Sequence, residues 1–432
     1  MTTKITEQNI SNLANTGVQW QAVVTASTLA ASAGKGYFIN TTSNACLVTV
    51  PAVAVSTAGD TIVLKDYART WQTNNVTINT NLLDGNSNET HIFSAQGATV
   101  KLVFMDATKG WSLINEDTTT ELQIPPTFIA ATGGTVATSG NYKIHSFTGD
   151  SNFVVSSVGN APVTPAGGPN AVSYLVVAGG GMGASSHGGG GGAGGFREGR
   201  VAAPEHTASP LVAAGLTITA QTYPITVGGG GAGGTALPST SAGRPGSNSV
   251  FSTITSAGGG SIARYNVSTP VAAPTKNGGS GAAASGHPDR IGQGNTPPVS
   301  PPQGNNGGSG PGGAPIYYGG GGGGATAAGA TGNPSSGGTG GAGATTHITG
   351  SPVAYAGGGG GGIYNHPIGA TGGTGGGGQG NPAPGGYSGP VSDGTANTGG
   401  GGGGGAGAPG GAPNEGGGSG GKGIVVIKYK FQ

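Results

Sequence analysis

Unbroken glycine runs fill the C-terminal part of this chain and constrain its fold more than any other feature. Between Gly179 and the C-terminus lie 84 of the 98 glycines, including the runs 319–324, 357–362 and 399–405. The chain nevertheless ends on the apolar segment 424–431, which is typical of a β-strand. A strand needs a folded body on which to pack, so we expect the glycine-rich region to be ordered. Glycine this dense leaves few side chains for chemistry, which indicates a structural scaffold.

Three structures are available to such a region. Gly/Ser-rich sequence usually forms a disordered linker, but this region returns to an apolar strand. A collagen triple helix needs one glycine in every third position, and runs of six or seven glycines break that period. In polyglycine II, extended helices of three residues per turn direct their N–H and C=O groups outward and bond to neighbouring rods. The sequence favours this third structure.

Polyglycine II predicts the backbone geometry of the runs. Angles of about φ −75° and ψ +145°, or their mirror image, should dominate the three longest runs. About eight such runs would form a bundle of two or three layers. Glycine loses the most backbone entropy on ordering, so stability must come from lateral hydrogen bonds and from dispersion between closely packed chains. Replacing Gly360 by valine should be costly, because a Cβ would force the rods apart.

The residues before the glycine runs predict β-structure. Seven short β-branched or aromatic runs follow Gly36 and are separated by turn residues such as Asp84-Gly85. This spacing is typical of a small sandwich or barrel. Similar short runs lie between residues 127 and 177, and the last of them leads directly into a glycine run. The seven expected strands are 37–39, 46–50, 61–64, 76–78, 92–93, 100–104 and 111–114.

We therefore predict a mainly β protein with two folded parts. A small β-sandwich or barrel domain spans residues 31–117, and a β-edged polyglycine-II domain spans residues 127–432. The proline-containing stretch 118–126 is predicted to be a linker. Residues 1–30 are polar, with a short helix expected near 7–13, and lack a core of their own. We expect this first segment to attach the chain to a larger assembly or to mediate its oligomerisation.

Composition excludes several function classes. Charged residues make up 7% of the chain, against about 25% in an average soluble protein, and the net charge is +1. Such a surface gives no attraction for nucleic acid or an anionic membrane. Cys46 is the only cysteine, so a disulfide within the chain and a cysteine metal cluster are excluded. No signal peptide or long apolar stretch is visible, and we expect synthesis in a cytoplasm.

No motif predicts catalysis, a metal or a cofactor. The segment 416–423 is close to a phosphate-binding loop, but Gly423 stands where Ser or Thr would bind magnesium, and a strand rather than a helix follows. The seven histidines include no pair with zinc-ligand spacing, and the aspartates of the β region lie at predicted turns. We expect a protein that is not an enzyme and uses no cofactor.

Aromatic and polar residues between the glycine runs are the better candidates for function. Loops held by a rigid scaffold are the usual place for binding residues, although the same side chains could instead seal the ends of the rods. Tyr364, Asn365 and His366 favour binding, because Pro367 fixes a turn beside them. The candidate binding residues are Tyr364, Asn365, His366, Tyr317, Tyr318, Tyr387, Arg264, Tyr265, Phe196 and His287.

Two stretches resemble fibre proteins of bacteriophages. Residues 37–114, with Tyr37-Phe-Ile-Asn-Thr-Thr and Asp106-Ala-Thr-Lys-Gly-Trp111, resemble a small β domain common in fibres of marine phages. Residues 128–432, from Tyr142-Lys-Ile-His-Ser-Phe147 to the terminal strand, resemble the glycine-rich C-terminal domains of such proteins. The glycine blocks are also similar to the distal adhesins of T-even-like tail fibres, in which polyglycine-II rods present variable receptor-binding loops.

The resemblance implies a virion fibre or adhesin that binds a host-surface glycan or outer-membrane protein. It further implies a homotrimer on the virion surface that contacts other virion proteins through its N-terminus and binds no nucleic acid. Two other functions stay open: a capsid-decorating or head-fibre protein without a specific receptor, and a cellular surface-layer or filament protein. The absence of a visible secretion signal disfavours the last of these.

Overall fold

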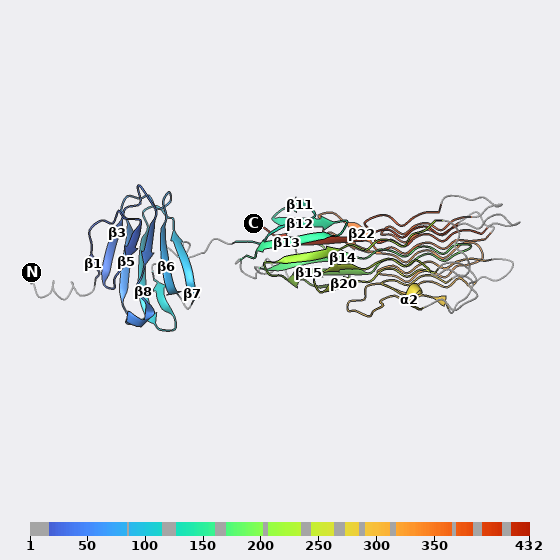
Figure 1. Ribbon diagram of the computed structural model, residues 1–432, viewed down its shortest axis with the longest axis horizontal. Coiled ribbons are helices and arrows are strands. Elements are labelled where there is room, and N and C mark those ends of the chain that lie inside the picture. Colours follow the sequence, from blue (N-terminus) through green and yellow to red (C-terminus); the bar gives the residue numbers. More distant parts are fainter. Residues whose placement is uncertain are drawn as a thin grey trace, which may run out of the picture. The chain divides into compact units, whose positions relative to one another are not determined.

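The structure is a computed structural model that divides between Pro126 and Thr127 into two compact units. Both units are built from β-strands, so the chain is mainly β, as predicted, and the second unit continues into a bundle of extended runs (Figure 1). The expected helix near 7–13 and the expected linker 118–126 lie outside the described residues. The structure describes residues 17–83, 86–114, 127–159, 170–201, 206–234, 243–262, 273–284, 290–311, 317–364, 369–382, 391–407 and 416–432.

In the first unit the chain alternates between two halves of one curled sheet. Its strand order is β1-β3-β5-β8-β9-β6-β4-β2, with β7 beside β6. Strands β1, β3 and β5 run parallel in one half, and β2, β4 and β6 run parallel in the other. Strand β9 pairs with both β8 and β6 and so joins the halves. The strands are β1 (Gln19–Trp20), β2 (Thr28–Ala30), β3 (Lys35–Ile39), β4 (Cys46–Thr49), β5 (Thr61–Asp66), β6 (Val76–Leu83), β7 (Asn86–Phe93), β8 (Thr99–Asp106) and β9 (Gly110–Leu113), and the 3-10 helix η1 spans Val53–Val55.

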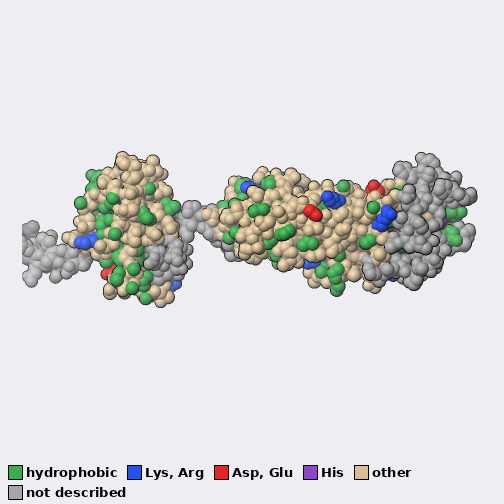
Figure 2. Space-filling view, in the orientation of Figure 1, with side chains coloured by type: hydrophobic (Ala, Val, Ile, Leu, Met, Phe, Trp, Pro, Cys, Tyr) green, Lys and Arg blue, Asp and Glu red, His purple; other side chains and the backbone are tan. Residues whose placement is uncertain are grey.

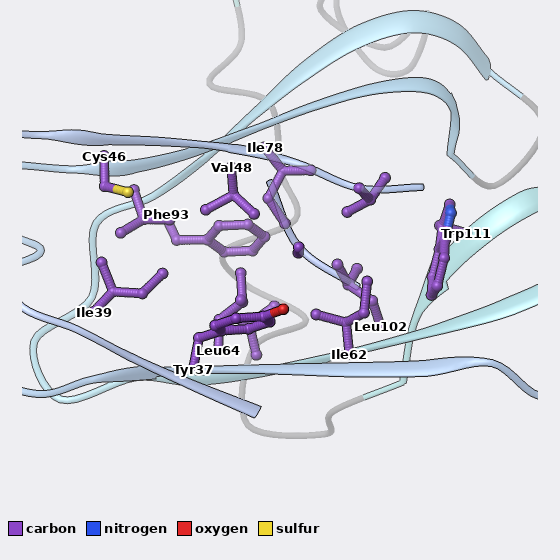
Figure 3. Packing of buried hydrophobic residues seen from close by; sticks show 14 of the residues in the cluster. Tyr37, Ile39, Cys46, Val48, Ile62, Leu64, Ile78, Phe93, Leu102 and Trp111 are labelled. Atoms are coloured by element: carbon purple, nitrogen blue, oxygen red, sulfur yellow. The ribbon is translucent and has the colours of Figure 1, made fainter. Parts of the chain in front are cut away.

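One hydrophobic core fills the space between the two halves. Figure 3 shows Val48, Ile78 and Phe93 of one half facing Ile62 and Leu64 of the other. Trp71 and Trp111 are fully buried in the same core. The indole N–H of Trp111 donates to the carbonyl of Pro51 at 2.9 Å, which satisfies the polar atom of this buried ring.

All seven predicted strands overlap with β3 to β9, but the predicted N-terminal boundary differs from the structure. Trp20 pairs with Gly36 of β3 and Leu29 pairs with Val48 of β4. Residues 17–30 are therefore part of the β unit rather than of a separate attachment segment. Strands of two or three residues contain too little alternation for the sequence to reveal them.

The second unit begins with two sheets packed face to face. One has the order β10-β13-β18-β19-β20, and the other the order β11-β12-β23-β14-β15-β16, with β17 beside β14. Strands β21 and β22 form a separate pair, and the four-residue helix α2 spans Ala273–Lys276. The strands are β10 (Ala130–Thr132), β11 (Thr135–Ser139), β12 (Tyr142–Phe147), β13 (Ser151–Ser157), β14 (Ala171–Val177), β15 (Phe196–Arg200), β16 (Val212–Ala214), β17 (Leu216–Thr217), β18 (Thr222–Thr226), β19 (Ser249–Phe251), β20 (Ile254–Ser256), β21 (Ala344–Thr346), β22 (Val353–Tyr355) and β23 (Ile424–Lys430).

The C-terminal strand β23 contributes to two cores at once. It lies between β12 and β14 and is antiparallel to both. Val425, Ile427 and Tyr429 pack in the core between the two sheets. Ile424 and Val426 pack on the opposite face, in a core that also contains residues of the glycine runs. Because both faces are covered, the first four residues of the strand, Ile424 to Ile427, are apolar without alternation.

The glycine runs form laterally bonded rods, as predicted. In the rod 188–195 every third backbone N–H donates to the same neighbouring rod, at 2.8–3.0 Å. Residues 188, 191 and 194 donate to rod 399–405. Residues 190 and 193 donate to rod 319–324, and residues 192 and 195 donate to rod 257–262. Its carbonyls accept, at 2.8–3.1 Å, from three further rods, 178–184, 278–284 and 357–362. This rod therefore has six neighbours. A period of three is the signature of polyglycine II.

The backbone angles show which of the two predicted mirror-image helices the runs adopt. Among the residues of runs 319–324, 357–362 and 399–405, only Gly399 has a positive φ, of 71°. The mirror-image form is therefore not used. Because an inner rod is surrounded on all sides, the bundle has at least three layers, at the upper limit of the sequence prediction.

At most of their glycine positions, the inner rods approach one another too closely for a side chain. A Cβ added at Gly191 would lie 2.2 Å from the carbonyl oxygen of Gly181, and one at Gly359 would lie 2.0 Å from that of Gly402. Real Cβ atoms do not come this close to an oxygen. Glycine is required at these positions because of packing against the neighbouring rods.

The outer rods carry side chains and meet solvent. Runs 326–332 and 391–398 interrupt their glycines with Thr, Ala, Ser, Asp and Asn, and most of these residues are exposed. These outward-facing side chains terminate the lateral packing of the rods, since another rod cannot approach them closely. Figure 2 shows only isolated charged side chains on this face of each unit, in line with the 7% of charged residues.

Replacing Gly360 by alanine tests this packing. Its Cβ would lie 2.1 Å from the carbonyl oxygen of Ala370, so the neighbouring rod must shift. We expect the free energy of unfolding to fall by about 2 kcal/mol or more, as for an overpacked core. The matched control is Gly229→Ala, because a Cβ at this exposed rod position has no atom within 4 Å. Equal unfolding midpoints of the two variants in urea would contradict the close packing.

A histidine is buried as a neutral group in the core of the second unit. His145 of β12 is fully buried; its Nδ1 lies 2.7 Å from the Gly133 carbonyl and its Nε2 lies 3.0 Å from the Tyr429 hydroxyl. The carbonyl can only accept, so Nδ1 carries the proton and Nε2 accepts from the hydroxyl. Burial raises the pKa of Tyr429 to about 12, which keeps that hydroxyl a donor. Burial also lowers the pKa of His145, assisted by the charge of Lys143.

The second unit should therefore lose stability in mild acid. As the pH falls below about 6.5, the unfolded chain takes up the His145 proton before the folded chain does. The contribution of neutral His145 to the free energy of unfolding should be fully present above this pH. It should be lost as the pH falls through the folded-state pKa. His145→Gln cannot titrate and should remove this part of the pH dependence. Urea unfolding from about pH 7.5 to about pH 5 measures it; an unchanged pH dependence in the variant would refute the assignment.

Candidate binding site

Three aromatic rings meet at the end of the bundle that lies away from the sheets. Rod 178–184 leaves β14 and rod 188–195 returns to β15, so the turn at 185–187 lies at this far end. The ends of three other runs lie beside it, because Gly188 is bonded to Gly362 and Gly405. Tyr364 forms a backbone bridge with Gly407 and donates its N–H to the carbonyl of Tyr317 at 2.9 Å. These connections gather residues that are far apart in the sequence.

The three rings form a compact cluster. His187 stacks on Tyr317 with ring centroids 5.3 Å apart and meets Tyr364 edge to face at 5.2 Å. The two tyrosine rings meet edge to face at 6.0 Å. All three residues are partly exposed. We call His187, Tyr317 and Tyr364 the far-end cluster. Such geometry is favourable for aromatic pairs.

The backbone around His187 is adapted to hold its ring. Ser186 and His187 both have positive φ, of 55° and 51°, which is uncommon for residues with a side chain and makes the tight reversal between two rods. The imidazole then lies directly on Gly407, where an added Cβ would be 1.8 Å from its Cδ2 and Nε2 atoms. Gly407 therefore provides the space into which the ring packs.

The structure brings together two of the residues predicted from the sequence. Tyr317 and Tyr364 belong to the far-end cluster, and Tyr318 is beside them, paired through its backbone with Ile363. Sequence reasoning missed His187. It shows the same signal as the others, since Ser185-Ser186-His187 interrupts two glycine runs. The remaining candidates Asn365, His366, Tyr387, Arg264, Tyr265 and His287 lie outside the described residues.

The prediction that Phe196 contacts a receptor is wrong. Phe196 is 1% exposed and is the first residue of β15, where it packs with Leu175 and Val426 in the core between sheet and rods. The residue follows a glycine run, as the far-end aromatics follow or precede one, but it lies at the sheet end of its rod. There the ring is needed to seal the core.

A buried carboxylate near the sheets fastens a loop to strand β15. Glu198 of β15 is 1% exposed and lies 3.2 Å from the Nε2 atom of His206. It also accepts hydrogen bonds from the Ser209 N–H at 2.8 Å and the Thr346 hydroxyl at 2.5 Å. Burial alone would raise the pKa of Glu198, but the bonds from His206, Ser209 and Thr346 outweigh it and hold that pKa below its usual range. The carboxylate stays charged and ties residues 206–209 and β21 to β15.

No group of three or more His, Cys, Asp or Glu side chains in the described ranges is arranged to hold a metal ion. Within the same ranges, no helix has the length and apolar character needed to cross a bilayer.

A family model for a glycine-rich domain matches residues 155–430, nearly two thirds of the chain. The match begins in β13 and ends at the last residue of β23, so it includes most strands of both sheets together with the rods. The chain therefore belongs to this family of glycine-rich domains. No curated protein matches the chain significantly.

The packing of His187 on Gly407 predicts that substitutions at these two positions have non-additive effects on stability. Gly407→Ala should unstack His187 and lower the free energy of unfolding by about 1–3 kcal/mol. In a His187→Ala background, Gly407→Ala should lower the free energy of unfolding much less. The three atoms nearest to the added Cβ all belong to the His187 ring, and every atom of another residue is at least 2.9 Å away. Urea unfolding of the four proteins in the cycle measures this difference. Equal costs in both backgrounds would show that the ring does not occupy this position.

Proposed function

We propose that this chain is a non-enzymatic bacteriophage fibre or adhesin protein that binds a host-surface glycan or outer-membrane protein. The observation that most supports it is the far-end cluster, three partly exposed rings held at the end of a backbone-bonded bundle. The proposal further includes a position on the virion surface, a homotrimer, and contacts with other virion proteins through residues near the N-terminus.

The physical properties of the bundle favour recognition at its end. The inner rods consist mostly of glycine, and side chains such as those of Met182 and Ala193 are buried, so these rods offer no side chains to a partner. Their lateral hydrogen bonds make the bundle stiff, so residues at its end keep a fixed spacing. Aromatic anchors held on a rigid scaffold lose little conformational entropy on binding. A scaffold of this kind lets the residues between rods vary without disturbing the fold.

The chemistry of the far end suits sugars or polar protein loops. Aromatic faces stack on the apolar faces of sugar rings, and tyrosine hydroxyl groups form hydrogen bonds with sugar hydroxyls. The chain has a net charge of only +1, whereas nucleic acids and polyphosphates need clustered cations. The sequence resemblance to phage fibres adds the virion context to this argument.

Substituting two residues of the far-end cluster tests the proposal. We expect the labelled full-length protein to bind cells of at least one strain in a panel of bacteria, as measured by flow cytometry. Tyr317→Ala/Tyr364→Ala should weaken that binding at least about tenfold, equivalent to about 1.4 kcal/mol. Protease treatment of the cells would then separate an outer-membrane protein from a glycan receptor.

The control is Tyr67→Ala, which removes a 56% exposed tyrosine from the first unit and should leave binding unchanged. Circular dichroism and unfolding midpoints show whether the double variant is folded. Normal binding by a folded double variant would remove the far-end cluster from the site. If the protein bound no strain but decorated virions, the proposal of an adhesin would fail in favour of a structural decorating protein.

A further inference from the structure

The first unit has a pocket on the outer face of its sheet, away from the core. Its volume is about 550 Å³, within the range of pockets that hold small ligands. Strands β1, β5 and β8 contribute to it, together with the turns at Gly34 and Gly59. The side chains that matter for the argument are Val18, Trp20, Asp60, Thr61, Val63 and Lys101.

The strand register explains why these side chains face outward together. Gly36 of β3 pairs with Val63 of β5, which pairs in turn with Lys101 of β8. Directly paired residues share one face of a sheet, and their neighbours Ile62 and Leu102 point into the core. Since Gly36 has no side chain, the outer face is hollow at this point. Trp20 occupies part of the hollow, and a Cβ at Gly36 would be 2.7 Å from its ring.

Trp20 is held in place yet remains open to solvent. Its ring stacks on Phe38 with centroids 4.3 Å apart and an interplanar angle of 19°. Trp20 is nevertheless 45% exposed, whereas Trp71 and Trp111 are fully buried. An ordered, half-exposed tryptophan that lines a pocket forgoes part of the stabilisation that burial would give. This placement is typical of a residue that contacts a ligand.

The two charged groups of the pocket balance in formal charge. One oxygen of the Asp60 carboxylate accepts the Thr57 N–H at 2.8 Å, which holds the side chain at the pocket. Lys101 supplies an ammonium group from β8. One carboxylate and one ammonium give no net formal charge, so the pocket favours a neutral ligand with several hydroxyl groups over a polyanion. Most of the exposed pocket wall is polar, which disfavours a purely apolar ligand.

We propose that this pocket binds one or two rings of a neutral glycan. The uncovered part of the Trp20 indole packs on the C–H face of a sugar ring. Asp60 accepts hydrogen bonds from sugar hydroxyls, and Lys101 donates to sugar oxygens. This site is separate from the far-end cluster and does not depend on the function proposed for it, because the pocket lies entirely in the first unit.

Tryptophan fluorescence of the full-length protein tests the proposal directly. Trp20 is the one exposed tryptophan of the three in the chain, so acrylamide quenching should report on it alone. The probes are maltose, cellobiose, lactose and mannobiose. We expect at least one to protect Trp20 from quenching with a Kd on the order of 1 mM. The ligand is then followed by saturation-transfer NMR in variants.

Trp20→Ala should weaken binding of that disaccharide at least about tenfold, and Lys101→Ala, which alters only an exposed side chain, should weaken it measurably. Tyr67→Ala and Tyr317→Ala/Tyr364→Ala should not affect it. Failure of all four probes would overturn the proposal. So would binding only of uronic-acid or sialic-acid saccharides, which would exclude the neutral class. Protection of Trp20 by self-association, seen as concentration-dependent sedimentation, would show instead that a second copy covers the pocket.

Discussion

Backbone hydrogen bonds between buried rods are the constraint on which the second unit depends. A buried N–H or C=O must find a partner, and an extended glycine helix has none within itself. Rod 188–195 meets this requirement with six neighbours, each bonded at every third residue. Each such bond contributes about 0.5–1.5 kcal/mol, against a backbone entropy cost of about 1–2 kcal/mol per residue. The hydrogen bonds alone therefore fall short of the entropy cost, so dispersion between the closely packed rods and the hydrophobic cores around β23 must supply the rest.

The same constraint determines where side chains can act. Inner glycines have neighbouring carbonyl oxygens about 2 Å from the position of a Cβ, so variation is limited to outer rods, rod ends and the first unit. The far-end cluster lies at rod ends, and the pocket lined by Trp20 lies in the first unit, so both are places where side chains can vary. In each, a glycine makes room for an aromatic ring: Gly407 for His187 and Gly36 for Trp20. The fold thus separates a backbone-only scaffold from the few places where recognition can occur.

Periodic and compositional patterns made much of this architecture predictable. Short β-branched or aromatic runs separated by turn residues predicted the seven strands β3 to β9, and runs without a Cβ predicted the rods. Features that depend on distant partners were not accessible. Strand β15 has the sequence Phe-Arg-Glu-Gly-Arg, which is typical of a loop, and becomes a strand because β14 pairs with it and Thr346 satisfies Glu198. The candidate site was likewise predictable only in part. The pattern of an aromatic residue beside a glycine run pointed to Tyr317 and Tyr364. The same pattern pointed to Phe196, which lies at the sheet end of its rod and is therefore in the core.

Hydrogen–deuterium exchange of the inner rods tests the central claim most directly. If rods 188–195, 357–362 and 399–405 are bonded laterally on all sides, their amides exchange only when the bundle opens. We predict protection as strong as that of β14 and β23, with exchange controlled by global unfolding of the second unit. Exchange within seconds, at the rate of an unstructured glycine chain, would contradict the hydrogen-bonded bundle and with it the account of both scaffold and far-end cluster.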